Sequence, residues 1–360
     1  MTPAPAAGPK PAVLVTGATG LVGAELMDQL QQNGVDVVGV SRRGSPRGSS
    51  VVAWDMSKQP PPDHLRRRHW DAIVNTAANT RWTMDPNEAT EANVSSVTAL
   101  EPLASEGTHF IHVSTAYAVG LREDVESADP QDYRNTYEWS KAHAERVARE
   151  TFAHLTVVRP PLIVGRRHDG RAARFSGMYA LIRGLTVGTV PAVVAEPDAY
   201  FDAIPVDDLA WLLADLAEER NTRAGSVLTM AAGPSAPTVE EAIGAVVGSL
   251  NQWRAQRGRS ALDQPRLITP ESWDRFLLPF VREHLTPRQL LILELLGNFE
   301  PYLALAKPLQ PDLTVDDVPS CLATSTFYWA EKNHRVAALT PRPWSPPQGD
   351  GVGEGAPGRA

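Results

Sequence analysis

The stretch AVLVTGATGLVG, residues 12–23, decides the fold of this chain. A short apolar strand over 12–16 leads into a turn with glycines in the spacing TGxxGxxG, and a helix is expected from the turn to about Gln32. Glycines let the backbone approach a diphosphate closely, and the first N–H groups of the helix supply donors. The pattern therefore predicts a dinucleotide-binding strand, turn and helix. We expect the turn to contact the cofactor through Gly17, Thr19, Gly20, Leu21, Val22 and Gly23.

Apolar strands and helical segments alternate after this turn. Strands are expected at 35–40, 51–54, 72–76, 110–114 and 155–159, and helices at about 88–105 and 135–151. Strands separated by helices predict a parallel sheet covered on both faces. The fold class is therefore α/β, with the doubly wound sheet of a Rossmann domain.

The chain divides into a cofactor half and a substrate half. We expect 12–165 to form the Rossmann domain, and 200–232 to return to it as a strand, a cap at Asp207 or Asp208, and a helix. The stretches 166–199 and 233–340 predict a smaller, mainly helical substrate-binding domain. Its densest apolar run, 285–306, indicates a buried core helix or, less favoured, one wall of an acyl pocket. The Pro-rich ends, 1–11 and 341–360, predict disorder.

Composition narrows the class of protein. Of the 360 residues, 42% are apolar and 21% are charged, as in ordinary soluble proteins, and no apolar run is long enough to predict a membrane span. The net charge of −8 argues against a nucleic-acid binder. The single cysteine, Cys321, excludes an internal disulfide and is expected to be structural, and no histidine spacing predicts a metal site. Because no secretory signal precedes the first strand, a cytoplasmic location is expected, and the oligomeric state is left open.

The end of the second strand selects the cofactor. Ser41, Arg42 and Arg43 stand where an NAD site usually carries an acidic residue, and Arg47 lies nearby. Guanidinium groups bind a 2′-phosphate, so the sequence predicts NADPH, with a solvated basic loop as the alternative. After the third strand, Asp55 and the adjacent Met56 are expected beside the adenine, although an acidic residue there also forms turns.

Three residues are candidates for catalysis. Tyr137 and Lys141 lie one helical turn apart, and a cation beside a phenol is expected to lower the pKa of the tyrosine, so that it exchanges a proton near neutral pH. Lys141 is also expected to bind the cofactor by holding the nicotinamide ribose. Thr115, at the end of a strand, would give a second hydrogen bond to the substrate oxygen. Ser114 is its rival and a further candidate for cofactor contact, although alternation along the strand aims it at the opposite face.

These motifs, in this order, resemble those of the extended short-chain dehydrogenases/reductases. Three of the motifs are similar to those of the thioester-reductase and fatty acyl-CoA reductase branch: NTYEWSKAHAE (135–145), NTRW (79–82) and RPPLIVG (159–165). The resemblance covers about residues 12–232. It implies that Ala77, Ala78 and Asn79 line the cofactor channel, that Asn93 steadies the active-site helix, and that Pro160, Leu162 and Ile163 meet the nicotinamide amide. For Trp82 it leaves open a substrate contact or an aromatic that fills a crevice.

The resemblance implies an NADPH-dependent reductase of an acyl thioester, giving the aldehyde and, after a second round, the alcohol. With no carrier domain in the chain, the thioester is expected on coenzyme A or on a separate acyl or peptidyl carrier protein. The alternatives are an extended-family ketoreductase, epimerase or dehydratase, and a regulatory cofactor-binding protein. Ala116 and Tyr117 after Thr115 disfavour a dehydratase, and the basic residues at 42–43 disfavour an NAD-retaining epimerase.

Two basic clusters have competing interpretations. The run 66–69, RRRH, indicates a solvated helix end or a contact for an acidic carrier or a phosphate. The second cluster lies closer to where substrate should enter, and it could bind the phosphates of a carrier or of coenzyme A. Its members are Arg166, Arg167, Arg171 and Arg174.

Overall fold

The centre of the molecule is a sheet of eight strands in the order β12-β10-β6-β5-β4-β1-β2-β3. The computed structural model describes residues 10–45, 50–188, 192–218, 224–277 and 299–341, together with positions 279 and 297. Every pairing in the large sheet is parallel. The strand order reverses between β1 and β4, as the doubly wound class predicts. The strands are β1 Ala12–Thr16, β2 Asp36–Ser41, β3 Val51–Ala53, β4 Ala72–Asn75, β5 His109–Val113, β6 Leu155–Arg159, β10 Val227–Ala231 and β12 Leu313–Thr314.

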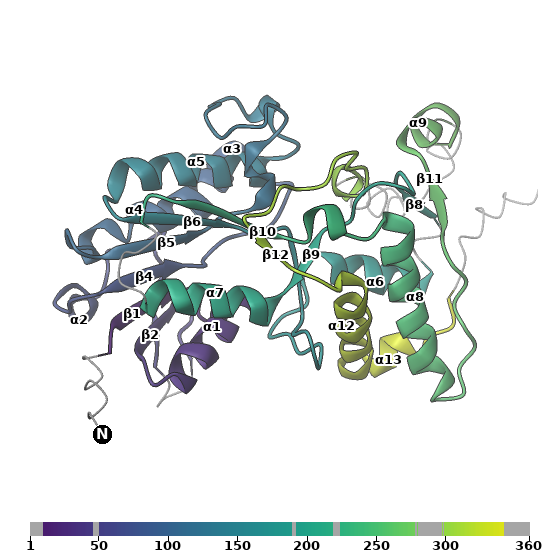
Figure 1. The fold of residues 1–360 in the computed structure, drawn as a ribbon, viewed down its shortest axis with the longest axis horizontal. Helices are drawn as coiled ribbons and strands as arrows, with labels where there is room; N and C mark the ends of the chain where they lie inside the picture. The colour runs from purple at the N-terminus through teal and green to yellow at the C-terminus, as the bar shows by residue number, and fades with distance from the viewer. Residues whose placement is uncertain are drawn as a thin grey trace, which may run out of the picture.

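Helices cover both faces of this sheet (Figure 1). Helices α1 (Leu21–Gln32) and α7 (Val206–Glu218) pack together on one face. Helix α5 (Thr136–Thr151) lies on the other face with the short helices α3 (Pro86–Ala89) and α4 (Ser95–Thr98). Strand β1 is largely apolar because both of its faces are buried. Val13 and Val15 belong to the core under α1 and α7, whereas Leu14 belongs to the core under α5.

A second region lies beyond the edge of the sheet that carries β10 and β12 (Figure 1). Its core joins α6, α8, α12 and α13 and includes Cys321, which is 1% exposed. Burial raises the pKa of the Cys321 thiol to about 11, which fits its expected structural role. The elements here are α6 Met178–Val187, α8 Val239–Ala255, α9 Pro270–Ser272, α12 Val318–Lys332 and α13 His334–Ala337, with the parallel pairs β7 Leu162–Val164 with β9 Ala203–Pro205 and β8 Ala192–Val194 with β11 Arg266–Ile268.

The helix expected over 88–105 is broken into pieces. It begins at Pro86 because the Asp85 carboxylate caps the N–H groups of Asn87 and Glu88. The pieces are α3 Pro86–Ala89, a π-helix over Thr90–Val94, α4 Ser95–Thr98 and a 3-10 turn over Glu101–Leu103. The π-helix holds Asn93 in a buried position, and such irregular turns are frequent at functional sites.

Two further expectations change. Helix α7 begins at Val206, so Asp207 and Asp208 lie in its first turn rather than at a cap, where their charge favours the helix N-terminus. Strand β12 comes from the stretch 233–340, assigned from sequence to the substrate domain, yet it pairs with β10 in the large sheet. The remaining short helix, α2, spans Asp63–Arg66.

Some expectations fall on residues outside the described ranges. These are the ends 1–9 and 342–360, Arg47, and the apolar run from 285 to 296. Among the helices of the described ranges, none is both long and apolar enough to cross a membrane.

Candidate active site

The candidate site lies at the carboxyl ends of β1, β4 and β5. Strands β1 and β4 are neighbours, but the chain leaves them toward opposite faces of the sheet, which opens a crevice where ligands of such sheets bind. Thr16 ends β1, Asn75 ends β4 and Val113 ends β5. The phosphate-binding turn and the strand before Thr115 therefore meet at one edge.

The turn after β1 requires glycine. Gly17 has φ +65°, and a Cβ there would lie 2.8 Å from Thr76 Oγ1 and 2.9 Å from the Ala77 amide nitrogen. A Cβ on Gly23 would lie 2.2 Å from the Gly17 carbonyl oxygen. Gly20 is the N-cap of α1, with no side-chain cap and no acidic residue in the first turn. The first N–H groups of α1 can therefore bind an anion.

The end of β2 presents two guanidinium groups to solvent. Arg42 and Arg43 are exposed, and no carboxylate in the described ranges pairs with them. The Asp55 carboxylate accepts hydrogen bonds from the Ser57 amide at 3.3 Å and the Ser57 hydroxyl at 2.9 Å, so it closes a turn. Ser41 donates to the Gly44 carbonyl, and Met56 is half-buried. Their contacts with a cofactor stay predictions.

Helix α5 carries the expected pair. The Asn135 side chain caps it by accepting from the Glu138 amide at 3.0 Å. The Lys141 side chain, 1% exposed, reaches β5, where its Nζ donates to the Val113 carbonyl oxygen at 2.8 Å and lies 3.2 Å from His112 Nε2. Burial lowers the pKa of Lys141 to about 8, and the charge of Glu145 opposes that shift.

The pKa of Tyr137 differs from the expectation. Burial raises it above the usual value, and the nearby Glu138 carboxylate raises it further. The expected lowering by Lys141 is wrong in this arrangement because the Lys141 ammonium group is directed at β5. Tyr137 is therefore held as the protonated phenol, the form that donates a proton to a developing oxyanion.

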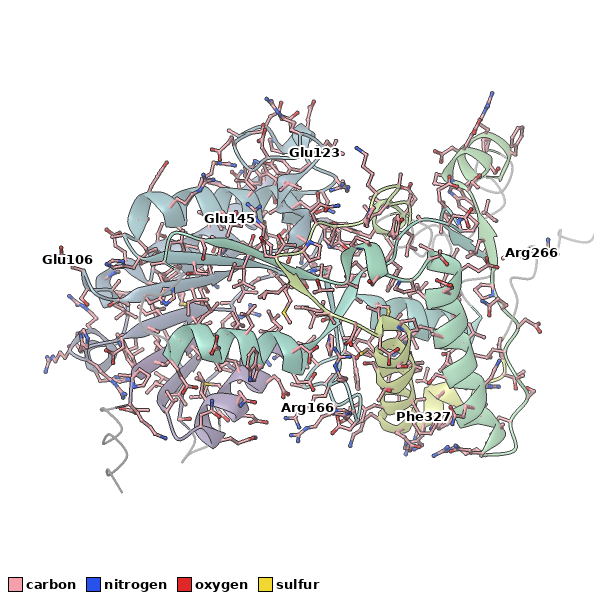
Figure 2. The ribbon with its side chains drawn as sticks, viewed as in Figure 1. Glu106, Glu123, Glu145, Arg166, Arg266 and Phe327 are labelled. Atoms are coloured by element: carbon pink, nitrogen blue, oxygen red, sulfur yellow. The ribbon has the colours of Figure 1, made fainter. Side chains whose placement is uncertain are left out.

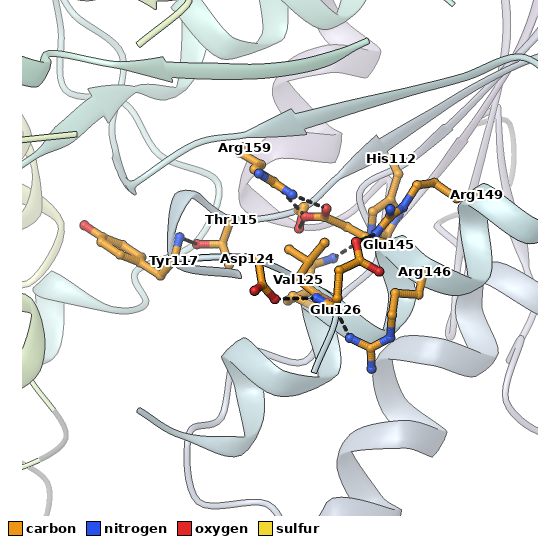
Figure 3. A network of polar contacts seen from close by, with 12 residues as sticks. His112, Thr115, Tyr117, Asp124, Val125, Glu126, Glu145, Arg146, Arg149 and Arg159 are labelled. Carbon is orange, nitrogen blue, oxygen red and sulfur yellow. Dashed lines mark hydrogen bonds and ion pairs between the residues drawn. The ribbon is translucent and has the colours of Figure 1, made fainter. Parts of the chain in front are cut away.

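The two hydroxyls at the end of β5 have different partners. Thr115 caps the short 3-10 turn Ala116–Val119, and its Oγ1 accepts from the Tyr117 amide at 3.4 Å. Ser114 donates to the buried Glu145 carboxylate. That carboxylate also pairs with Arg159, as Figure 3 shows. The distance from Arg159 Nη2 to Glu145 Oε2 is 2.6 Å. Ser114 is thus tied to the contact between β6 and α5, which leaves Thr115 as the better catalytic candidate.

Asn93 joins two walls of the site. Its Oδ1 accepts from the Asn79 amide at 2.7 Å, and its Nδ2 donates to the Asn79 carbonyl at 3.1 Å and to Ser140 Oγ at 2.8 Å. Ser140 lies between Tyr137 and Lys141 on α5. The loop after β4, which holds the half-buried Ala77 and the exposed Ala78, is therefore fixed to the catalytic helix.

The segment after β6 borders the same edge. The Pro160 carbonyl accepts from the Ala116 amide at 2.8 Å, which fixes Pro160 beside the 3-10 turn that follows Thr115. Leu162 and Ile163 are half-buried in β7. Their contact with a nicotinamide stays a prediction.

The sequence did not reveal an aromatic cluster formed by Trp82, Tyr117, Phe299 and Tyr302. The Tyr302 ring lies 4.7 Å from that of Tyr117 and 5.1 Å from that of Trp82, and Phe299 lies 4.7 Å from Trp82. Trp82 therefore packs among aromatic rings, as the crevice-filling interpretation has it. Nothing in the sequence pairs these rings, because Phe299 and Tyr302 come from a distant part of the chain.

Tyr302 also ties the second region to the start of α5. Its hydroxyl donates to Glu138 Oε1 at 2.7 Å and accepts from Asn135 Nδ2 at 2.7 Å. The Glu138 carboxyl is fully buried and also pairs with Arg134. Burial raises the pKa of Glu138, and the Tyr302 and Arg134 contacts oppose that shift.

Two of the four arginines after β7 pair with carboxylates. Arg166 pairs with Glu25 of α1 at 2.7 Å, at the junction of the two regions in Figure 2, and Arg167 pairs with Asp208. Arg166 and Arg167 therefore form structural ion pairs, and the phosphate contact that the sequence left as an alternative is not supported for these two residues. The exposed Arg174 donates from Nε to the Thr19 carbonyl in the phosphate-binding turn at 3.0 Å, and Arg171 is exposed.

The run 66–69 lies at the amino ends of the strands, because it precedes β4. The candidate site lies at the opposite, carboxyl ends. Its arginines contact Asp63 and Asp36, and Arg68 stacks on Trp70. The structure therefore supports the interpretation of this run as a solvated helix end.

A family model described as "Male sterility protein" matches residues 62–212. Among curated relatives, the beta subunit of methionine adenosyltransferase 2 from Pongo abelii is 31% identical over 59% of this chain and 64% of its own length. Fatty acyl-CoA reductase 1 from Gallus gallus is 26% identical over 54% and 52%, and dTDP-4-dehydrorhamnose reductase from Mycobacterium tuberculosis is 27% identical over 77% and 84%. The chain thus spans about half to two thirds of the length of two of these three relatives.

Solved structures with the same fold include reductase domains. The terminal R domain of the myxalamid PKS-NRPS pathway has a TM-score of 0.65 at 19% identity, covering 94% of both chains. A thiolation-reductase di-domain from an archaeal non-ribosomal peptide synthetase has a TM-score of 0.59 at 17% identity, covering 91% of both. The Bordetella bronchiseptica enzyme WbmG, solved with NAD and UDP, has a TM-score of 0.60 at 15% identity, covering 93% of this chain and 100% of WbmG. At these identities the likeness establishes the Rossmann-type fold.

Proposed function

We propose that this chain is a nicotinamide-dependent oxidoreductase of the extended short-chain dehydrogenase/reductase type, and that it reduces an acyl thioester with NADPH. The observation that carries the proposal is the match to the male sterility protein model over 62–212. That segment contains the catalytic candidates Thr115, Tyr137 and Lys141 and the aromatic Trp82. The products are the thiol and an aldehyde, which a second hydride transfer converts to the alcohol.

The residues at the carboxyl ends of β1, β4 and β5 fit this reaction. Bound NADPH would supply the hydride that adds to the thioester carbonyl carbon. Tyr137, held as the phenol, gives its proton to the carbonyl oxygen while the Thr115 hydroxyl hydrogen-bonds to it. Collapse of the resulting hemithioacetal breaks the carbon–sulfur bond and releases the thiol. Lys141, one helical turn from Tyr137 and with a pKa lowered to about 8, exchanges a proton near neutral pH and so fits a supporting role in proton return.

NADPH is the preferred cofactor in this proposal. Arg42 and Arg43 lie at the end of β2, where they can bind a 2′-phosphate, and no acidic residue stands there to bind the 2′-hydroxyl of NAD. The thioester is delivered on coenzyme A or on an acyl or peptidyl carrier protein. The thiolation-reductase di-domain of similar fold supports a carrier.

A second candidate is a reductase of a sugar-nucleotide carbonyl. It is favoured by the match to dTDP-4-dehydrorhamnose reductase, which extends over 84% of that enzyme. It uses the same catalytic residues, so only the substrate separates the two.

The test follows NADPH oxidation with a medium-chain acyl-coenzyme A, an acyl carrier thioester, a simple ketone and a sugar-nucleotide ketone, with products identified by mass spectrometry. We expect thioester-dependent oxidation that yields aldehyde or alcohol, and Tyr137→Phe is expected to lower kcat by about 10²–10⁴-fold. Tyr328→Phe, on α12 outside the site, serves as the control and should keep full activity. Turnover of either ketone without turnover of the thioesters would refute the thioester proposal.

A further inference from the structure

A buried polar chain crosses the ends of three strands. It consists of Thr16, Asn75, His112 and Lys141, each 0–1% exposed. Thr16 Oγ1 donates to Asn75 Oδ1 at 2.6 Å, Asn75 Nδ2 lies 3.3 Å from His112 Nδ1, and His112 Nε2 lies 3.2 Å from Lys141 Nζ. The chain thus runs from the residue before the phosphate-binding turn to the catalytic helix. The mechanism above uses Lys141 but assigns nothing to His112.

The surroundings of Asn75 fix the orientation of its side-chain amide. The Ala77 backbone N–H, which can only donate, lies 3.3 Å from Asn75 Oδ1. The amide oxygen therefore faces Ala77 and Thr16, and the amide NH₂ faces His112. Since Asn75 donates to His112 Nδ1, that nitrogen must be the acceptor. A neutral His112 then carries its proton on Nε2.

This tautomer constrains Lys141. An Nε2–H pointing at Lys141 Nζ needs a lone pair there, which the amine has and the ammonium lacks. The neutral amine can still donate to the Val113 carbonyl oxygen. When Lys141 takes up a proton, an N–H of its ammonium group faces the Nε2–H of His112. The clash is relieved if the His112 proton moves from Nε2 to Nδ1 and the Asn75 side-chain amide turns its oxygen toward Nδ1. Thr16 and Ala77 then lose that oxygen as an acceptor.

We propose that His112 is a positioning residue whose tautomer, set through Asn75, governs whether Lys141 is charged and links that charge to the phosphate-binding turn. The proposal rests on the proposed function only for the role of Lys141 in the reaction. Burial acts in the same direction, because it lowers the pKa of both Lys141 and His112. Within the described ranges, the other titratable groups near Lys141 lie on its own helix. Glu145 favours the ammonium form of Lys141, and its carboxylate is also paired with Arg159. Tyr137 is held as the neutral phenol.

The direct test needs no substrate. In protein labelled with ¹⁵N-histidine, nitrogen shifts distinguish the two tautomers, and the His112 signals are assigned by their absence from His112→Gln. About two pH units above the Lys141 pKa of about 8, we expect the proton on Nε2, and about two units below it, on Nδ1. The same tautomer at both pH values would overturn the proposal, whatever substrate the enzyme uses.

The kinetic test uses any carbonyl substrate that is turned over. Glutamine at position 112 offers a carbonyl oxygen to the ammonium, so His112→Gln should raise the Lys141 pKa and move the alkaline fall of kcat/KM upward by about one pH unit. His112→Leu offers no acceptor and should move it downward or leave it in place. A uniform loss of rate in His112→Gln with an unmoved pH profile would indicate a purely structural role and refute the proposal.

His109 provides a matched control on the same strand. It is 2% exposed and contacts Thr156 and the Leu216 carbonyl rather than Lys141. His109→Gln should leave the alkaline fall of kcat/KM unmoved. An equal shift in both variants would trace the effect to general loosening of β5 and would overturn the role of His112.

Discussion

The carboxyl edge of the sheet and the second region contribute to the site in different ways. At the sheet edge, the chemical groups come from short stretches, and each group is fixed by its own strand end or helix turn, as with Gly17 after β1 and Thr115 after β5. The second region contributes through side chains that arrive from far along the chain, such as Phe299 and Tyr302. The two regions also share Arg166 and Arg167, which pair with α1 and α7.

This difference indicates that the carboxyl ends of the strands and the second region have different roles in the site. The proposed function assigns cofactor binding and proton transfer to the carboxyl ends of the strands, whichever carbonyl substrate is bound. The second region covers the start of α5 with aromatic rings, where a substrate would contact the protein. Changes in the first region should therefore alter the rate with all substrates, and changes in the second should alter the choice among them.

The largest effect among the variants that test this comparison is expected from Thr115→Val. The substitution keeps the shape of the side chain but removes a hydrogen bond to the developing oxyanion, so kcat should fall by about 10²–10³-fold with every carbonyl substrate. Steady-state kinetics with thioester and aldehyde substrates measures it. Ser114→Ala is the control, and it should cost much less activity because the Ser114 hydroxyl is bonded to Glu145. An equal loss of kcat in Thr115→Val and Ser114→Ala would contradict the choice of Thr115 over Ser114 as the catalytic hydroxyl.

An intermediate effect is expected at the end of β2. Replacing Arg42 and Arg43 by alanine should raise KM for NADPH by about 10–100-fold, because charge-assisted hydrogen bonds to the 2′-phosphate are lost. KM for NADH should change little. Arg66→Ala, at the opposite sheet edge, is the control for loss of a surface charge. Equal changes for NADPH and NADH would contradict the predicted 2′-phosphate site.

The smallest effect is expected from Tyr302→Phe in the second region. It removes the donor to the buried Glu138 carboxylate and should lower the free energy of unfolding by about 1–3 kcal/mol at neutral pH, as measured by urea denaturation. KM for the acyl substrate should change by about two- to fivefold, with kcat for a small aldehyde nearly unchanged. A general loss of rate as large as that in Thr115→Val would break the comparison between the two regions.

The stability deficit of Tyr302→Phe should depend on pH. The Tyr302 contact lowers the pKa of Glu138, whereas burial raises it, so its removal raises the folded-state pKa further. A raised folded-state pKa contributes stability at low pH that is lost as pH rises through it. The deficit should therefore grow from acid to neutral pH. A deficit of the same size at all pH values would argue that the Glu138 charge is not involved.

Local patterns in the sequence were sufficient for the framework. Strands β1 to β6, helix α1, the glycine turn and helix α5 were predicted within a few residues, because periodicity and glycine geometry act over short distances. Strands β10 and β12 of the same sheet were not predicted. The helix over 88–105 was predicted less well. The helix begins after the capping Asp85, and a π-helix follows in which Asn93 donates to Ser140 on another helix.

The sequence by itself determined which residues stand at the strand ends, and therefore the fold class and the candidates Thr115, Tyr137 and Lys141. Only the tertiary structure decided their electrostatics. Burial raises the pKa of Tyr137, and His112 with the Val113 carbonyl draws Lys141 toward β5. Burial and long-range pairing depend on which segments pack together, and the Tyr302–Glu138 bond joins residues 164 positions apart. Such contacts leave no periodic trace in the sequence, so their consequences for charge and proton position appear only in the folded chain.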